Sequence, residues 1–223
     1  MELAQLVVFV RPPTIGAVKT RLGRAFGEEG AAALYRAFVD DTLELCQRVR
    51  NAGRVDVALW AAEIDDPVVI EWGRRLGTAP RLQPDGDLGT RLCAAFDEGL
   101  RRHERVVIIG SDAPTLPFRL IVAAFNALDT APMALGPAND GGYYAIGSTH
   151  RVRPHFGGVR WSTPTALEDT QRANDEHEIA ILSPWYDIDE PADLHILRAH
   201  LSARPKAAPA TARCLGELLS GQR

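Results

Sequence analysis

The stretch Val106-Val107-Ile108-Ile109-Gly110-Ser111-Asp112-Ala113-Pro114 is the strongest indication of the fold. Four consecutive β-branched residues that end at a glycine are typical of a strand buried on both faces, as in a parallel sheet covered by helices. Ligands of such sheets bind beyond the carboxyl ends of the strands. Asp112, two residues past Gly110, is therefore in a position where it could hold a ligand.

Shorter apolar runs recur along the chain and alternate with amphipathic stretches. The expected strands cover residues 6–10, 55–60, 106–110, 133–136, 143–147 and 179–182, and the expected helices cover 28–50, 67–76, 88–102, 116–128, 163–173 and 191–201. This alternation predicts an α/β fold with a mostly parallel sheet covered on both faces. We expect one domain over residues 1–201, followed by a tail over 202–223 with at most a short helix near 215–219.

The composition narrows the class of protein. The chain has 223 residues, 46% of them hydrophobic and 24% charged, with a net charge of −4. These values are typical of a globular protein and do not favour a nucleic-acid partner. Three cysteines without a CxxC pair argue against a disulfide framework or a zinc site and fit a reducing compartment. The run over residues 6–10 is too short for a membrane span or a signal peptide, so we expect a cytoplasmic protein. The oligomeric state, a homodimer included, stays open.

A basic loop follows the first expected strand. It carries Arg11, Lys19 and Arg21 within eleven residues. Backbone N–H groups and cations at a strand end suit the phosphates of a nucleotide. A solvated basic loop would have the same composition, and the spacing of a P-loop is absent.

Three acids after strands are candidate metal ligands. Asp112 could ligate Mg²⁺ while phosphates and waters supply the other ligands, or it could belong to a turn or a helix cap. Asp187 and Asp189 point to the same face of an extended segment. Either residue could complete a metal site or cap the next helix, and Asp189 is the better candidate ligand. Asp193 fits the first turn of that helix.

Two glycine-rich turns complete the set. The Asn-Asp-Gly-Gly sequence at 139–142 is an ordinary hairpin signal, although Asp140 there could bond a ligand hydroxyl. The turn over 83–91 could line a base or sugar pocket or simply start a helix, and its candidate ligand-binding residues are Gly86, Asp87, Gly89 and Arg91. Asp140 and Asp87 are also the candidates for a general base.

Together the loops resemble one known family. The motifs are FVRPPTIGAVKTRL (9–22), GDLGTR (86–91), GSDAP (110–114), GPANDGGY (136–143), WST (161–163) and DIDEP (187–191). They resemble the GT-A-fold "transferase 1" family, which is encoded near radical-SAM and selenodomain genes and often labelled glycosyltransferase. The wider resemblance, over about residues 5–200, is to the nucleotide-diphospho-sugar transferase superfamily, which includes 2-phospholactate guanylyltransferase.

This resemblance implies a three-layer GT-A sandwich with a mostly parallel mixed sheet. It implies that Lys19 and Arg21 bind phosphates, that Asp112 holds Mg²⁺ or Mn²⁺, and that Asp189 is the second metal ligand. Glu190 departs from the pattern, which usually has Thr there as the helix cap. Glu is a poor cap, so we expect this helix to start differently from the pattern.

Three functions follow from these readings. The first, favoured by the family label, is glycosyl transfer from a nucleotide-diphospho-sugar to a small acceptor, with Asp140 near a hydroxyl. The second is transfer of a nucleotidyl group from an NTP to a small phosphorylated acceptor, with Lys19 and Arg21 stabilising the transition state. The third is a non-catalytic nucleotide-binding protein. It ranks last because it predicts a damaged metal site, whereas Asp112 and Asp189 are both present.

Overall fold

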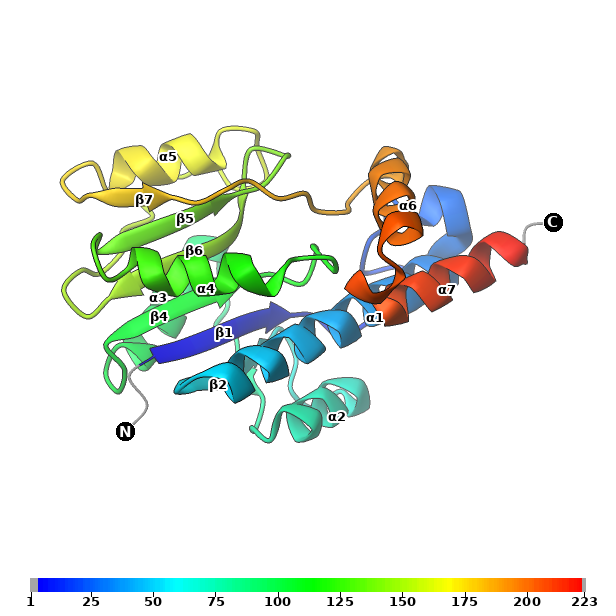
Figure 1. Cartoon of the computed structure of the whole chain (residues 1–223), viewed down its shortest axis with the longest axis horizontal. Helices are drawn as coiled ribbons and strands as arrows, with labels where there is room; N and C mark the ends of the chain where they lie inside the picture. Colours follow the sequence, from blue (N-terminus) through cyan, green and yellow to red (C-terminus); the bar gives the residue numbers. More distant parts are fainter. Residues whose placement is uncertain (1–3, 222–223) are drawn as a thin grey trace.

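The computed structural model describes residues 4–221, and a seven-stranded sheet forms its centre (Figure 1). The strands are β1 (Ala4–Val10), β2 (Val55–Ala61), β3 (Arg81–Leu82), β4 (Arg105–Ile109), β5 (Met133–Pro137), β6 (Tyr143–Thr149) and β7 (Ile179–Ile181). Their order across the sheet is β3-β2-β1-β4-β6-β5-β7. Only β6 is antiparallel to its neighbours among these strands. The expected mostly parallel, mixed sheet is confirmed.

Helices cover both faces of this sheet. They are α1 (Gly23–Ala52), α2 (Pro67–Leu76), α3 (Leu88–Gly99), α4 (Phe118–Ala127), α5 (Ala166–Ala173), α6 (Leu194–Ala203) and α7 (Pro209–Ser220), with short 3-10 helices η1 (Pro191–Asp193) and η2 (Pro205–Ala207). Residues of α1, α2 and α4 share one core cluster with the sheet, and residues of α3 and α5 share the other. The expected three-layer sandwich is confirmed.

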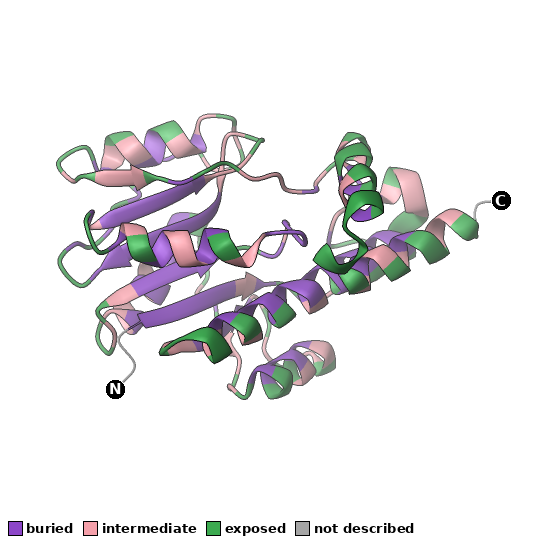
Figure 2. Ribbon diagram, in the orientation of Figure 1, coloured by how far each residue is buried: buried purple, intermediate pink, exposed green. Residues whose placement is uncertain are grey.

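The first strand shows why the apolar runs become strands. Leu6 and Val8 point into the core under α1, whereas Val7 points into the core under α3, and all three are fully buried. A strand whose two faces are both covered needs no polar alternation. Figure 2 shows the same contrast, with largely buried strands inside helices whose outer faces are exposed.

Local differences near the start of the chain and at the edge of the sheet separate the structure from the sequence-based expectations. Helix α1 begins at Gly23, five residues earlier than expected, and is kinked at Gly27, whose φ is 71°. Glycine adopts such a φ without steric cost. The edge strand β3 was not expected, because its two residues are too few to form an apolar pattern.

The segment after residue 201 forms more structure than a tether. Helix α7 lies beside α1 (Figure 1), and Thr211 and Leu215 are buried. The carboxylate of Asp41 on α1 accepts hydrogen bonds from the backbone N–H groups of Ala210 and Thr211, at 2.9 and 2.8 Å. This contact caps the start of α7, which is longer than the expected helix near 215–219. Within the part of the chain that the structure describes, every helix is too short or too polar to span a membrane.

Candidate active site

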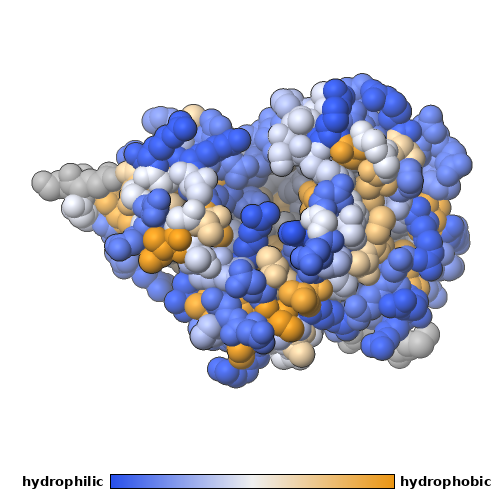
Figure 3. Space-filling view, turned by 180° about the vertical axis from the view of Figure 1, so that it is seen from behind, coloured by the Kyte–Doolittle hydropathy of each residue, from blue (hydrophilic) through white to orange (hydrophobic). Residues whose placement is uncertain are grey.

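A cleft of about 1050 Å³ opens at the carboxyl ends of β1, β4 and β5. Its walls come from the loop after β1, the loop after β4, the β5–β6 turn and residues 187–190 of the segment after β7. We call residues 183–190, which lead from β7 toward η1, the strap. Figure 3 shows the molecule hollowed near the middle of its back face. The cleft lies where ligands of open α/β sheets bind.

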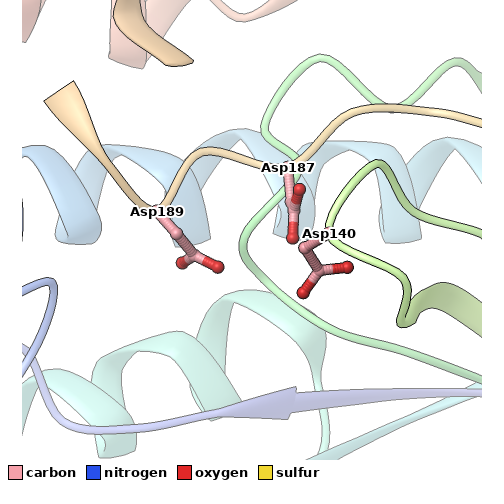
Figure 4. Close-up of side chains that lie close together, drawn as sticks. All are labelled: Asp140, Asp187 and Asp189. Carbon is pink, nitrogen blue, oxygen red and sulfur yellow. The ribbon is translucent and has the colours of Figure 1, made fainter. Parts of the chain in front are cut away.

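Three carboxylates meet in this cleft. Asp187 and Asp189 project from the strap, Asp140 projects from the β5–β6 turn, and one oxygen of each lies within 4.8 Å of the others (Figure 4). Burial, together with the charges of Asp140 and Asp189, raises the pKa of Asp187 to about 7. Like charges held this close repel one another unless a cation lies among them. We call these three residues the carboxylate cluster.

Backbone constraints hold the cluster together. Gly141 has φ of +87°, and a β-carbon there would collide with the carbonyl oxygen of Pro164, so glycine is required. The carboxylate of Asp140 accepts a hydrogen bond from the Gly142 backbone at 2.8 Å, which fixes the turn. The side-chain oxygen of Asn139 accepts from the backbone N–H of Asp187 at 3.0 Å and thereby joins the turn to the strap.

Lys19 lies against two acids. Its Nζ is 2.5 Å from Asp112 Oδ1, 2.5 Å from Asp189 Oδ1 and 2.7 Å from the Ile188 carbonyl oxygen. The side chain is only 6% exposed. Burial alone would lower the pKa of Lys19, but the charges of Asp112 and Asp189 more than offset burial and raise the pKa above its ordinary value. Lys19 is therefore a fixed, charged group in the cleft.

Asp112 lies in the cleft beyond β4, as its position in the sequence suggested. Its Oδ1 forms an ion pair with Lys19. Asp112 is not one of the three residues of the carboxylate cluster, in which Asp187 accompanies Asp140 and Asp189. Asp112 is still close, because its charge contributes to the raised pKa of Asp187. The i, i+2 spacing of Asp187 and Asp189 was the signal that pointed to the strap, although only Asp189 was preferred as a ligand.

Tyr35 on α1 supports the same region and carries no sequence signal of its own. Its buried hydroxyl accepts a hydrogen bond from the Arg11 backbone and shares one with Ser111 Oγ, both at 3.0 Å. The loops after β1 and β4 are thus joined to α1. Tyr35 reads as an ordinary core position in an amphipathic helix, so its site role was missed.

Three arginines that were expected to bind the ligand also line the cleft: Arg11 and Arg21, expected at phosphates, and Arg91, expected in a base or sugar pocket. Arg11 and Arg21 are exposed, and Arg21 pairs with Glu190 at 3.0 Å. Arg91 donates to Gln83 Oε1 at 3.2 Å, and its buried Nε has no hydrogen-bond partner among residues 4–221. These guanidinium groups are the cations best placed to meet an anionic ligand.

Three of the expected ligand-binding residues near the start of α3 do not line the cleft. Gly86, Asp87 and Gly89 are outside the residues that line the cleft. Asp87 caps α3 by accepting from the Thr90 backbone at 2.8 Å, and it also accepts from Trp161 Nε1 at 3.2 Å. The hydrogen bonds from Thr90 hold the pKa of Asp87 below its usual value. Asp87 is joined to the cleft through its hydrogen bond with Trp161, which lines the cleft.

The strap ends in a cap that Glu190 does not disturb. Asp193 Oδ2 accepts from the backbone N–H groups of Asp189 and Glu190, at 2.9 and 2.8 Å. The expected capping role of Asp193 is confirmed. Glu190 is the N-cap of η1 and forms a capping box with Asp193, and these bonds fix the backbone at Asp189, whose side chain lines the cleft.

A comparison with known protein families shows to which family the chain belongs. Residues 43–163, more than half of the chain, match a family described as "Uncharacterized protein conserved in bacteria (DUF2064)". The chain belongs to this family. The DUF2064 match includes Asp112 and Asp140 but not Lys19 or the strap. No curated protein matches the chain.

Among solved structures, a protein from Desulfovibrio desulfuricans G20 described as a putative nucleotide-diphospho-sugar transferase is 32% identical, with a TM-score of 0.83 over 97% of this chain and 95% of that one. A CMP:2-keto-3-deoxy-manno-octonic acid synthetase complexed with CTP is 14% identical, with a TM-score of 0.58 over 90% and 98%. The inositol-1-phosphate CTP transferase from T. maritima is 13% identical, with a TM-score of 0.54 over 96% and 97%.

These matches confirm the fold of the nucleotide-diphospho-sugar transferase superfamily for this DUF2064 chain. The expectation of an enzyme of the transferase class agrees with the description of the Desulfovibrio desulfuricans structure. Membership of the narrower family encoded near radical-SAM and selenodomain genes stays a prediction.

Proposed function

We propose that this protein is a metal-dependent glycosyltransferase that uses a nucleotide-diphospho-sugar as donor and a small molecule as acceptor. One observation carries the proposal: the carboxylate cluster of Asp140, Asp187 and Asp189 faces a cleft of about 1050 Å³ at the strand ends. A cleft of this size can enclose a nucleotide and its substituent.

The donor atoms fit a hard divalent cation. The cluster offers carboxylate oxygens, the ligands that Mg²⁺ and Mn²⁺ prefer. The pKa of Asp187 is raised by burial and, after it, by the neighbouring negative charges of Asp140 and Asp189, which a cation would offset. Asp140, Asp187 and Asp189 would hold Mg²⁺ or Mn²⁺, and Asp112 lies in the same cleft against Lys19. The ion, when bound, would offset charge that develops on a diphosphate leaving group.

The remaining walls suit the rest of a nucleotide. Arg11, Arg21 and Arg91 line the cleft and would bind phosphate oxygens. Tyr143 and Trp161, whose rings meet edge to face with centroids 6.4 Å apart, form an apolar wall on which a base or sugar could pack.

In glycosyl transfer an acceptor hydroxyl oxygen forms a bond to the anomeric carbon of the sugar. The bond from that carbon to the diphosphate oxygen breaks, the nucleoside diphosphate leaves with the electron pair, and the hydroxyl proton passes to a base. Asp140 is the exposed member of the carboxylate cluster and is our candidate for contacting the acceptor hydroxyl.

Nucleotidyl transfer is the second candidate, because Arg11 and Arg21 on one loop of the cleft suit a triphosphate. Two of the fold neighbours have CTP in their descriptions. The case is weaker than the loop composition suggested, since Lys19 is engaged by Asp112 and Asp189.

A thermal-shift panel tests both candidates. The protein is mixed with Mn²⁺ or Mg²⁺ and with either NTPs or nucleotide-diphospho-sugars, and each mixture is repeated with EDTA. We expect a metal-dependent rise in Tm with a nucleotide-sugar, because a ligand that binds only the folded chain stabilises it. A shift confined to NTPs would replace glycosyl with nucleotidyl transfer.

The Asp187→Asn variant tests the metal ligands in the same panel. It removes one charge from the cluster and should lose most of the metal-dependent shift. Shifts that persist unchanged in EDTA would contradict a metal requirement altogether.

A further inference from the structure

Three oxygens from two distant segments converge on the Lys19 ammonium. They are Asp112 Oδ1, Asp189 Oδ1 and the Ile188 carbonyl oxygen, at 2.5, 2.5 and 2.7 Å from Nζ. An ammonium group has three donors. Each donor of Lys19 thus has a protein acceptor, and the group has no donor left for a phosphate in this arrangement.

These oxygens form the type of pocket that a divalent cation occupies. Ca²⁺ is bound by carboxylate and backbone carbonyl oxygens at about 2.3–2.6 Å, and Mg²⁺ at about 2.0–2.1 Å. The pocket also shares Asp189 with the carboxylate cluster. A carboxylate shared between neighbouring cation positions is typical of two-metal sites, in which the ions lie about 3.5–4 Å apart.

The lysine is held in this pocket by its own surroundings. Its aliphatic stem is buried, and Nζ lies 5.9 Å from the centre of the Phe38 ring. Its backbone has φ of 46°, a conformation that non-glycine residues adopt only when the surrounding structure imposes it. Its carbonyl oxygen accepts a hydrogen bond from Gly23 N at 3.2 Å, next to the start of α1. The cation position is therefore filled by the chain itself.

We propose that Lys19 occupies the second cation position of the site, so that the protein takes one divalent ion, at Asp140, Asp187 and Asp189, in place of two. This inference rests on the proposed function, since it assumes that the carboxylate cluster binds a metal. Lys19 is then a positioning residue: its ammonium group holds the carboxylates of Asp112 and Asp189 in place. The phosphate contacts fall to Arg11, Arg21 and Arg91.

The test counts Mn²⁺ ions by isothermal titration calorimetry and by equilibrium dialysis, without nucleotide. We expect one ion for the parent and two for Lys19→Ala, which vacates the pocket and exposes three oxygens. Lys19→Met removes the charge but keeps the side-chain volume, so it should bind one ion. Arg36→Ala removes an equal charge from a surface pair with Glu71, outside the residues that line the cleft, and should also bind one ion.

Each outcome separates the two proposals. No ion bound to the parent would overturn the proposed metal site, whereas two ions bound to the parent would overturn only the role of Lys19. One ion bound to a folded Lys19→Ala variant, checked by circular dichroism, would also overturn the role of Lys19.

The half-exposed Asp112 supplies a second measurement if Lys19→Ala does not fold. Because Asp112 faces Lys19, Asp112→Asn should keep the parent's count of one ion and lose less than about tenfold in affinity, the smallest loss usual for groups that support a metal. A larger loss would make Asp112 a metal ligand and contradict the inference.

Discussion

The side-chain oxygen of Asn139 accepts a hydrogen bond from the backbone N–H of Asp187 at 3.0 Å, across 48 residues of sequence. This bond holds the turn that carries Asp140 against the strap, and so it sets the spacing of the proposed metal ligands. Such supporting groups typically contribute about 10–100-fold to metal affinity.

We therefore expect Asn139→Ala to weaken Mn²⁺ binding by about tenfold while leaving the far-UV circular dichroism unchanged. Calorimetric titration measures the loss. Asn126→Ala, at an exposed position on α4, is the matched control and should bind like the parent. Equal affinities for Asn139→Ala and the parent would show that the turn and the strap keep their places without this bond.

The Tyr35 hydroxyl joins the first loop to the β4 loop, and Tyr35→Phe removes it. The Arg11 backbone N–H and Ser111 Oγ lose their partner in a buried setting, which costs about 1–3 kcal/mol. Urea unfolding should show a decrease of that size in the free energy of unfolding. In a double-mutant cycle, Tyr35→Phe and Ser111→Ala should be less than additive, since they remove the same bond. Strict additivity would contradict the contact.

The Asp169 carboxylate gives a pH-dependent prediction for the loop that carries Trp161. Hydrogen bonds from the Arg160 side chain, at 2.8 and 2.9 Å, hold the pKa of Asp169 well below its usual value. An acid with a depressed folded-state pKa stabilises the fold above its unfolded pKa of about 4 and loses that contribution as the pH falls further.

Asp169→Asn should therefore be less stable than the parent at pH 7, and the difference should shrink below about pH 4. Urea unfolding at several pH values measures it. Glu168→Gln changes the neighbouring exposed acid and should give a much smaller difference at pH 7. A difference for Asp169→Asn that does not change with pH would show that the ion pair is not its cause.

Helix α7 depends on one acid of α1. Asp41→Ala removes the carboxylate that accepts from Ala210 N and Thr211 N, and such caps contribute about 1–2 kcal/mol. We expect α7 to detach more readily, so trypsin should cleave faster after the exposed Lys206. Glu44→Ala, an exposed acid on the same helix, should be cleaved at the parent's rate. Unchanged cleavage of Asp41→Ala would show that α7 is held by its apolar contacts alone.

The sequence predicted the layers because the strands are buried on both faces. Runs such as residues 106–109 carry that requirement in their composition. The hairpin signal at 139–142 indicated the antiparallel pairing of β5 and β6. The place of β6 beside β4 was not predictable in this way, because it depends on pairing between segments that are distant in the sequence. The start of α5, expected at 163, moves to Ala166 because Thr163 and Thr165 bond to each other in the loop before it.

The sequence predicted which residues lie in the site better than it predicted which of them contact one another. Asp112, Asp140 and Asp189 lie in one cleft, as strand-end positions in a parallel sheet imply. The sequence did not predict the partner of Lys19, because a basic loop has the same composition whether its cations bind phosphates or carboxylates. Only the approach of the strap, 170 residues away, decides that Lys19 meets Asp189.

That separation has a consequence for how the protein matures. Lys19 and the groups around it come from three separate segments, so they cannot assemble until β1, β4 and the strap have all folded. Contacts between such distant segments form late and slow folding. A partly synthesised chain would carry Asp112 and Asp140 without the strap, and so it would lack the means to trap a metal ion. A divalent cation bound at the proposed site would therefore stabilise only chains in which the strap has folded.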